Sequence, residues 1–220
     1  MLASTLLIAA LAGGAGFPAP GTYRYAAAMS GQHIGAWSVS VSQTGSGTEI
    51  DEDSTASMMG MQLSAKASLV LGLDLAPTSY AGNYHTPSQN PVVSATLTAT
   101  SATVSGAFNP EPQQLALEAN TRHFVVIEPG LLAGLFALPS QLNSWKDSAV
   151  TWITPATAQA QTLTTAAPAS GTRPAGVPPN DAVISIANPT PVTIWYDPST
   201  NVPDEIIVPS QNAVLTRQRP

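Results

Sequence analysis

Four acidic residues lie within five positions of this 220-residue chain, and they are the first residues whose spacing suggests chemistry. Glu49, Asp51 and Asp53 alternate, so an extended strand would place them on one face and Glu52 on the other. Three carboxylates in a row could bind Ca²⁺, which takes oxygen ligands. A flat strand separates neighbours on one face by ~6–7 Å, however, which is too far to share an ion without other ligands. We interpret them as a solvated face that protects a strand from aggregation.

The three histidines, His33, His85 and His123, occur singly and lack the spacing of a helical zinc motif. The chain also lacks a nucleophile elbow, a phosphate-binding loop and a dinucleotide fingerprint. A glycosidase-like pair of carboxylates could be dispersed, but only thirteen acidic residues are present to supply it. We therefore predict no catalytic residue, no metal site and no cofactor, and an enzyme with a dispersed site is the least favoured alternative.

The amino-acid composition excludes several classes of binding partner. Only 9% of residues are charged, against about 25% in ordinary domains, while 44% are hydrophobic. The seven basic residues are scattered, so the chain cannot neutralise a polyphosphate backbone, and we expect no nucleic acid partner. Docking on an anionic membrane surface is disfavoured for the same reason. The absence of cysteine excludes disulfides and thiolate chemistry.

An apolar run stands near the beginning of the chain. Residues 2–12 read LASTLLIAALA and are followed by GGAG and FPAP. A short apolar run before small residues and proline is typical of a secretory signal, so we predict a signal peptide at 1–16 and a periplasmic or secreted location. The alternatives are a truncated gene start or an apolar first strand, since no basic residue precedes the run. Because a membrane span needs about 20 residues and no stretch reaches that length, we expect no transmembrane span.

Period-two alternation of apolar and polar residues is the strongest structural signal. Residues 32–42 place Trp37 and Val39 opposite serines, and residues 61–71 and 91–100 repeat the pattern. One polar face per strand favours an antiparallel sheet. Further strands are predicted at 22–28, 48–58, 102–107, 113–118, 149–154, 159–164, 181–187, 192–196, 205–208 and 213–217, with turns at 45–47 and 197–201.

One segment has helical spacing instead. Leu131, Leu135 and Leu138 fall at i, i+4 and i+7, and Pro129 suits a first turn. We predict a helix at 129–138 that ends before Pro139. Because it is apolar nearly all round, it should be buried against the sheet, either as a plug or as a lid over an apolar cavity. The predicted fold is mainly β, a curved antiparallel sheet or half-barrel wrapping one apolar helix.

Residues 166–180 are rich in Pro, Ala and Gly and show no periodicity. They could link two domains, but the forty residues after them are too few for a second core. We predict a single β domain over 17–220 with a Pro-rich loop at 166–180.

Four pieces of sequence carry a resemblance: GTYRY at 21–25, GQHIG at 31–35, LDLAPTSY at 73–80 and IWYDPSTNVPDEI at 194–206. In this order they resemble uncharacterised exported bacterial proteins with a fold similar to the lipoprotein carriers LolA and LolB. The resemblance spans 21–217 and implies a strongly curved half-barrel around a helix. In LolA and LolB the concave face holds lipoprotein acyl chains. The resemblance implies no catalytic residues.

The sequence thus predicts an exported, non-enzymatic β protein that binds an apolar ligand or lipid between sheet and helix. The candidate ligand-binding residues are large apolar side chains of the predicted inner faces and helix: Trp37, Leu63, Leu97, Leu131, Leu135 and Phe136. The alternative is a structural or protein-interaction component of the cell envelope, with an envelope protein partner and a core filled by its own helix. The volume and lining of the space between helix and sheet distinguish the two.

Overall fold

The computed structural model describes residues 16–58, 60–106, 111–115, 123–146, 149–167 and 173–219. In these ranges the elements, in chain order, are β1 (Gly21–Met29), β2 (Gln32–Thr44), β3 (Gly47–Met58), β4 (Met61–Gly72), β5 (Pro77–His85), β6 (Val92–Leu97), β7 (Ala102–Ser105), β8 (Gln113–Leu115), β9 (His123–Val126), α1 (Ala133–Ser144), β10 (Val150–Thr154), η1 (Pro155–Thr157), β11 (Gln159–Ala166), β12 (Ala182–Asn188), β13 (Val192–Tyr196), β14 (Pro203–Val208), η2 (Pro209–Gln211) and β15 (Ala213–Gln218).

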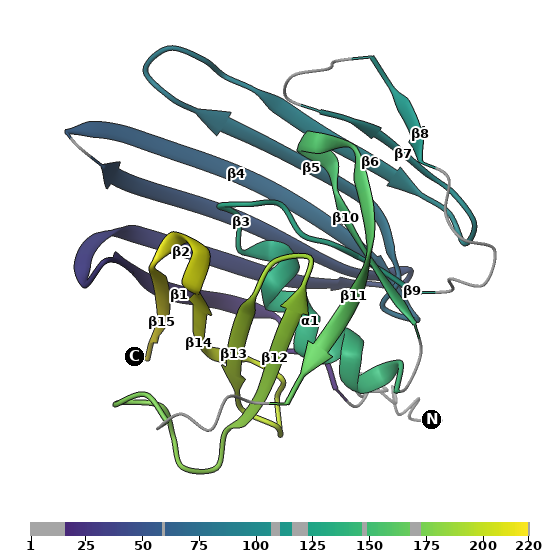
Figure 1. Ribbon diagram of the computed structural model, residues 1–220. Coiled ribbons are helices and arrows are strands. Elements are labelled where there is room, and N and C mark those ends of the chain that lie inside the picture. Colours follow the sequence, from purple (N-terminus) through teal and green to yellow (C-terminus); the bar gives the residue numbers. More distant parts are fainter. Residues whose placement is uncertain are drawn as a thin grey trace, which may run out of the picture.

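All fifteen strands of the described ranges belong to one sheet, in the order β8-β7-β6-β5-β4-β3-β2-β1-β15-β14-β13-β12-β11-β10-β9. The first and last strands pair at its centre, with Tyr25 opposite Arg217. Figure 1 shows the sheet curving around α1 and remaining open. The prediction of a mainly β fold with a curved sheet around one apolar helix is confirmed.

The prediction of antiparallel pairing holds with one correction. Within the described ranges β9 and β10 pair in parallel, with Val125 opposite Trp152. The sequence pattern predicts no strand at 123–126, because this segment is a continuous apolar run and does not alternate. Phe124, Val125 and Val126 are all buried, as expected for a parallel strand that is covered on both faces.

The helix differs from its predicted bounds. It begins at Ala133 and continues through Pro139 to Ser144, so the prediction of a helix at 129–138 that ends before Pro139 is wrong. Gly130 has a φ of 83°, and residues 129–130 form a turn that precedes the helix. Proline inside a helix removes one hydrogen bond. Here the helix tolerates this loss because residues 133–141 are buried, and tertiary packing outweighs local propensity.

Close packing and polar anchors fix α1 inside the curve. It packs on β3, β4, β9 and β14. Gly134 permits the approach to β9, because a Cβ at this position would lie 2.0 Å from the carbonyl oxygen of Val126. At the other end, Gln141 Nε2 donates to the Leu75 carbonyl at 2.9 Å, and Trp145 Nε1 donates to the Asp74 carbonyl at 2.9 Å. These two hydrogen bonds anchor the C-terminal end of the helix to residues 74–75.

Some predictions fall on residues that the structure does not describe. The apolar run at 2–12 lies outside the described residues, as do residues 168–172 of the Pro-rich loop. The predicted strand at 91–100 is shorter as β6, because Thr98 N donates to the Ser101 carbonyl at 2.9 Å and closes a turn. Across the ranges that the structure covers, no helix is both long and apolar enough to cross a membrane.

Candidate functional site

A cavity of about 270 Å³ lies between the first turn of α1 and one end of the curved sheet. It opens to solvent beside the exposed side chains of His85 and Gln211. Its lining includes Ala27, Met29, Ile34, Trp37, Ser54, Ala56, Met58, Leu63, Ser64, Ala65, Tyr84, His85, Thr86, Gly130, Leu131, Leu132, Leu135, Val208, Gln211, Ala213 and Leu215.

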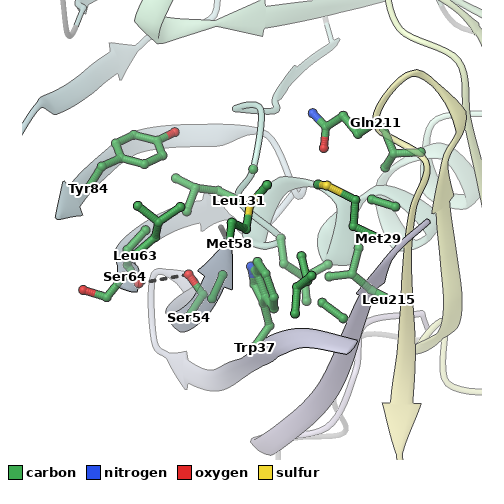
Figure 2. A pocket seen from close by; sticks show the side chains of 18 of the residues that line it. Met29, Trp37, Ser54, Met58, Leu63, Ser64, Tyr84, Leu131, Gln211 and Leu215 are labelled. Carbon is green, nitrogen blue, oxygen red and sulfur yellow. Dashed lines mark hydrogen bonds between the residues drawn. The ribbon is translucent and has the colours of Figure 1, made fainter. Parts of the chain in front are cut away.

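The lining combines the consecutive strands β1 to β5 with β14 and β15, which are distant in sequence but follow β1 in the sheet order. β3 contributes Ser54, Ala56 and Met58, which follow one another on the inner face because strand side chains alternate. Figure 2 shows Trp37 pointing inward between Met58 and Leu215, with Leu131 beyond it. Small residues on the inner faces leave room here that larger side chains would fill.

The structure brings four of the six predicted ligand-binding residues together. Trp37, Leu63, Leu131 and Leu135 line the cavity. Leu97 is buried in the core on β6, away from this lining. Phe136 is also buried, and its ring contacts that of Tyr23, with centroids 5.2 Å apart.

The rotation of about 100° between successive helical residues explains the placement of Phe136. Phe136 follows Leu135 on the helix and therefore points about a quarter-turn away from the cavity. Its side chain packs instead with the tyrosines of β1.

One cavity wall is held by a carboxylate from across the interior. Glu52 of β3 is 3% exposed, and its Oε2 accepts hydrogen bonds from Leu132 N at 2.6 Å and Ala133 N at 2.8 Å. The first N–H groups of a helix lack partners within the helix, and negative charge is favourable at this end. α1 has no acidic residue in its own first turn and no side-chain cap from Leu132. Glu52 supplies both functions from another element.

A second carboxylate holds the beginning of the same wall. Glu128 is 4% exposed, and its Oε2 accepts a hydrogen bond from Ala156 N of η1 at 2.9 Å. The Tyr84 hydroxyl donates to the Pro129 carbonyl, one residue further along the chain, at 3.4 Å. The segment 128–133 is thus fixed at both ends by buried acids, and its middle forms the cavity wall.

Burial has the largest effect on the pKa values of Glu52 and Glu128. Desolvation raises the pKa of Glu52 from 4.5 to about 7, against the lowering effect of the Ala133 and Leu132 N–H groups. Desolvation likewise raises the pKa of Glu128 to about 7, against the N–H of Ala156. The Tyr80 hydroxyl is buried without a hydrogen-bond partner among the described residues, and burial raises its pKa.

The acidic run behaves as a solvated face. Asp51 and Asp53 are exposed on the outer face of β3, and the Asp53 carboxylate lies 3.3 Å from the Lys66 ammonium. The side chains of both members of this ion pair are more than half exposed, so the pair adds little stability.

The three histidines lie on different strands. His33 is exposed on β2, and His85 contacts the Asn90 side chain at the end of β5. The His123 ring stacks on that of Trp145, with centroids 4.6 Å apart. In the portion of the chain that the structure describes, no group of three or more His, Asp or Glu residues could hold a metal ion.

Sequence reasoning missed Glu52, Met29 and Met58. Alternation places Glu52 on the same face as the apolar Ile50 and Ala56, which is the signal that could have identified a buried carboxylate. The two methionines stand at the ends of β1 and β3. The sequence alone does not show that a methionine at a strand end faces a cavity. The cavity is formed by the three-dimensional curvature of the sheet, which the sequence pattern does not specify.

Comparisons with known proteins give little further definition. Neither protein-family profiles nor curated proteins match the sequence. One solved structure is similar, that of a DUF1089 family protein (PA1994) from Pseudomonas aeruginosa. The two are 7% identical, the TM-score is 0.47, and the match covers 76% of this chain and 87% of that one. The resemblance to LolA and LolB stays a prediction.

Proposed function

We propose that this protein is an exported, non-enzymatic module that binds an apolar small molecule, such as a lipid chain, between α1 and the sheet. The cavity carries the proposal. It stays open beside a helix whose residues 136–141 are buried, and most of its lining is apolar. The apolar run at 2–12 supports the export part of the proposal.

The dimensions suit a slim ligand. Small-molecule pockets measure about 300–1,000 Å³, so a cavity of about 270 Å³ accommodates one small apolar molecule or one section of a longer chain. Each Å² of apolar surface that the ligand buries contributes about 25 cal/mol. Met29 and Met58 are partly exposed, and their flexible side chains can adjust to ligands of different shape.

The lining also favours binding over a purely structural role. An envelope component with a filled core needs its helix to occupy the whole interior. α1 does so along its buried residues 136–141, but Trp37, Leu131 and Leu135 surround empty space at its beginning.

Co-purification with a ligand tests the proposal. The protein is purified from native membranes and periplasm without detergent, extracted with organic solvent and analysed by mass spectrometry. Ala56→Phe puts a ring into the cavity, whereas Ala81→Phe makes the same change on the exposed outer face of β5. We expect wild-type protein and Ala81→Phe to carry an apolar molecule that Ala56→Phe lacks. Equal extracts from the two variants, or an empty wild-type protein, would contradict the proposal.

A further inference from the structure

The polar side chains that the structure describes in the cavity lining include no carboxylate, ammonium or guanidinium group. Among the described residues that line it, none is Asp, Glu, Lys or Arg. The polar members carry hydroxyl, amide, imidazole or phenol groups: Ser54, Ser64, Tyr84, His85, Thr86 and Gln211. Hydroxyl, amide and phenol groups hydrogen-bond an uncharged head but provide no counter-charge for an anion, and the imidazole of His85 provides one only when it is protonated.

The nearest buried charges behind the lining are acidic. Glu52 contacts the backbone of Leu132, a lining residue, and Glu128 stands two residues before Gly130, another lining residue. Both carboxyl groups are nearly inaccessible to water, so their charge is weakly screened toward the cavity. Asp53 is the next residue of the same strand, but its side chain points to the outer surface and pairs with Lys66.

Basic groups are engaged elsewhere. Arg217 lies two residues beyond the lining residue Leu215, but its guanidinium is 3.3 Å from the Asp204 carboxylate and stacks over the Tyr23 ring. Arg219 binds the same carboxylate at 2.8 Å. Arg173 lies over the Trp195 ring, 4.6 Å from its centroid. None of these three side chains belongs to the cavity lining.

We propose that the cavity selects uncharged ligands and discriminates against anionic ones of the same shape. The inference rests on the proposed function and defines the class of its ligand. An anion in this site would lose hydration without gaining a cation, and it would lie beside two buried carboxylates. The ligand's hydroxyl, ester or amide end lies at the mouth, near His85 and Gln211, and its apolar body lies against Trp37.

Two fluorescent probes with the same ring system test this selection. N-phenyl-1-naphthylamine is uncharged, and 8-anilinonaphthalene-1-sulfonate carries the same ring system with a permanent negative charge. Binding of each is titrated to the wild-type protein at about pH 8, above the raised pKa of both buried acids. We expect the neutral probe to bind at least about tenfold tighter than the sulfonate.

Variants of the two buried acids test whether their negative charge causes the selectivity. Glu52→Gln keeps an oxygen for the Leu132 and Ala133 N–H groups but removes the charge, and it should reduce the preference several-fold. Glu128→Gln provides the same test at the second acid if Glu52→Gln does not fold. Asp51→Asn removes an equal charge from the exposed face of the same strand and should leave the preference unchanged.

The outcomes separate this inference from the proposed function. If both probes bind the wild-type protein with equal affinity, the cavity binds ligands but the charge selection is wrong. A preference that Glu52→Gln and Glu128→Gln leave as large as in Asp51→Asn would also overturn it. If neither probe binds, the proposed function itself fails.

Discussion

The Oε2 atom of Glu52 lies 2.6 Å from the backbone nitrogen of Leu132, so a strand in the first half of the sheet caps a helix 80 residues later in the chain. The contact joins the inner face of β3 to the wall of the cavity. It is made by a carboxylate that is 3% exposed and that also accepts the Ala133 N–H. Helix position, cavity shape and buried charge therefore depend on one side chain.

Truncating the Glu52 side chain should reduce the free energy of unfolding more than neutralising its charge does. Glu52→Ala leaves two buried N–H groups without an acceptor, whereas Glu52→Gln keeps one. We expect Glu52→Ala to be less stable than Glu52→Gln by about 1–3 kcal/mol, measured by urea unfolding at one pH. Equal stability of the two variants would show that the cap contributes nothing.

Stability should fall as the pH rises through neutrality. Glu52 and Glu128 have pKa values near 7 in the folded protein and 4.5 as ordinary carboxyl groups. An acid whose pKa is raised by folding contributes stability that is complete below the lower value and lost as the pH passes the higher one.

Thermal unfolding between about pH 5 and about pH 8 measures this loss. We expect the Tm of the wild-type protein to decrease over this window. In Glu52→Gln and Glu128→Gln the decrease should be smaller, since each variant lacks one titrating group. A wild-type Tm that rises with pH across the window would refute the assignment.

The buried carboxyl group of Asp181 should destabilise the fold at pH values above its pKa. Burial, and then the charge of Asp204, raise the pKa of Asp181 from 3.8 to about 6. The Asp204 carboxylate is also bound by Arg217 and Arg219. Asp181→Asn should stabilise the protein by about 0.5–1 kcal/mol near pH 8 and by nothing near pH 4. Denaturant unfolding at the two pH values checks this, and a loss of stability near pH 8 would contradict it.

The close packing of α1 on β9 predicts that replacing Gly134 with alanine destabilises the protein, although helix propensity alone would predict the reverse. Alanine is normally better than glycine in a helix by about 1 kcal/mol. Gly134→Ala, however, would place its Cβ 2.0 Å from the Val126 carbonyl oxygen and should destabilise the protein by about 2 kcal/mol or more. Gly45→Ala has no atom within 4 Å and serves as the control. Stabilisation by Gly134→Ala would mean that helix and strand are not packed this closely.

Alternation and turn chemistry were sufficient to predict most of the sheet. The turn around Ser46 joins β2 to β3, and Asp197 begins the turn between β13 and β14. The bounds of α1 were not predictable from local rules, because Pro139 normally ends a helix and only burial on all sides keeps it inside this one. The parallel strand β9 was missed because a short apolar run carries no period.

The cavity itself could be predicted only in part. Trp37 and Leu131 are large apolar residues on predicted inner faces, and both line it. Leu97 is also a large apolar residue on a predicted inner face, but it lies away from the cavity. The alternation pattern identifies the inner face of a strand but not the end of the curved sheet at which space remains. Glu52 escaped notice because its neighbours in sequence are solvated acids, and its burial follows from the helix that lies across it.

A titration with N-phenyl-1-naphthylamine tests the central claim, an apolar binding site beside the first turn of α1, most directly. Fluorescence is followed for the wild-type protein, Ala56→Phe and Ala81→Phe under identical conditions. We expect saturable binding at one site in the wild-type protein and Ala81→Phe, and binding at least about tenfold weaker in Ala56→Phe. Absence of binding to the wild-type protein, or equal affinity in all three proteins, would contradict the account.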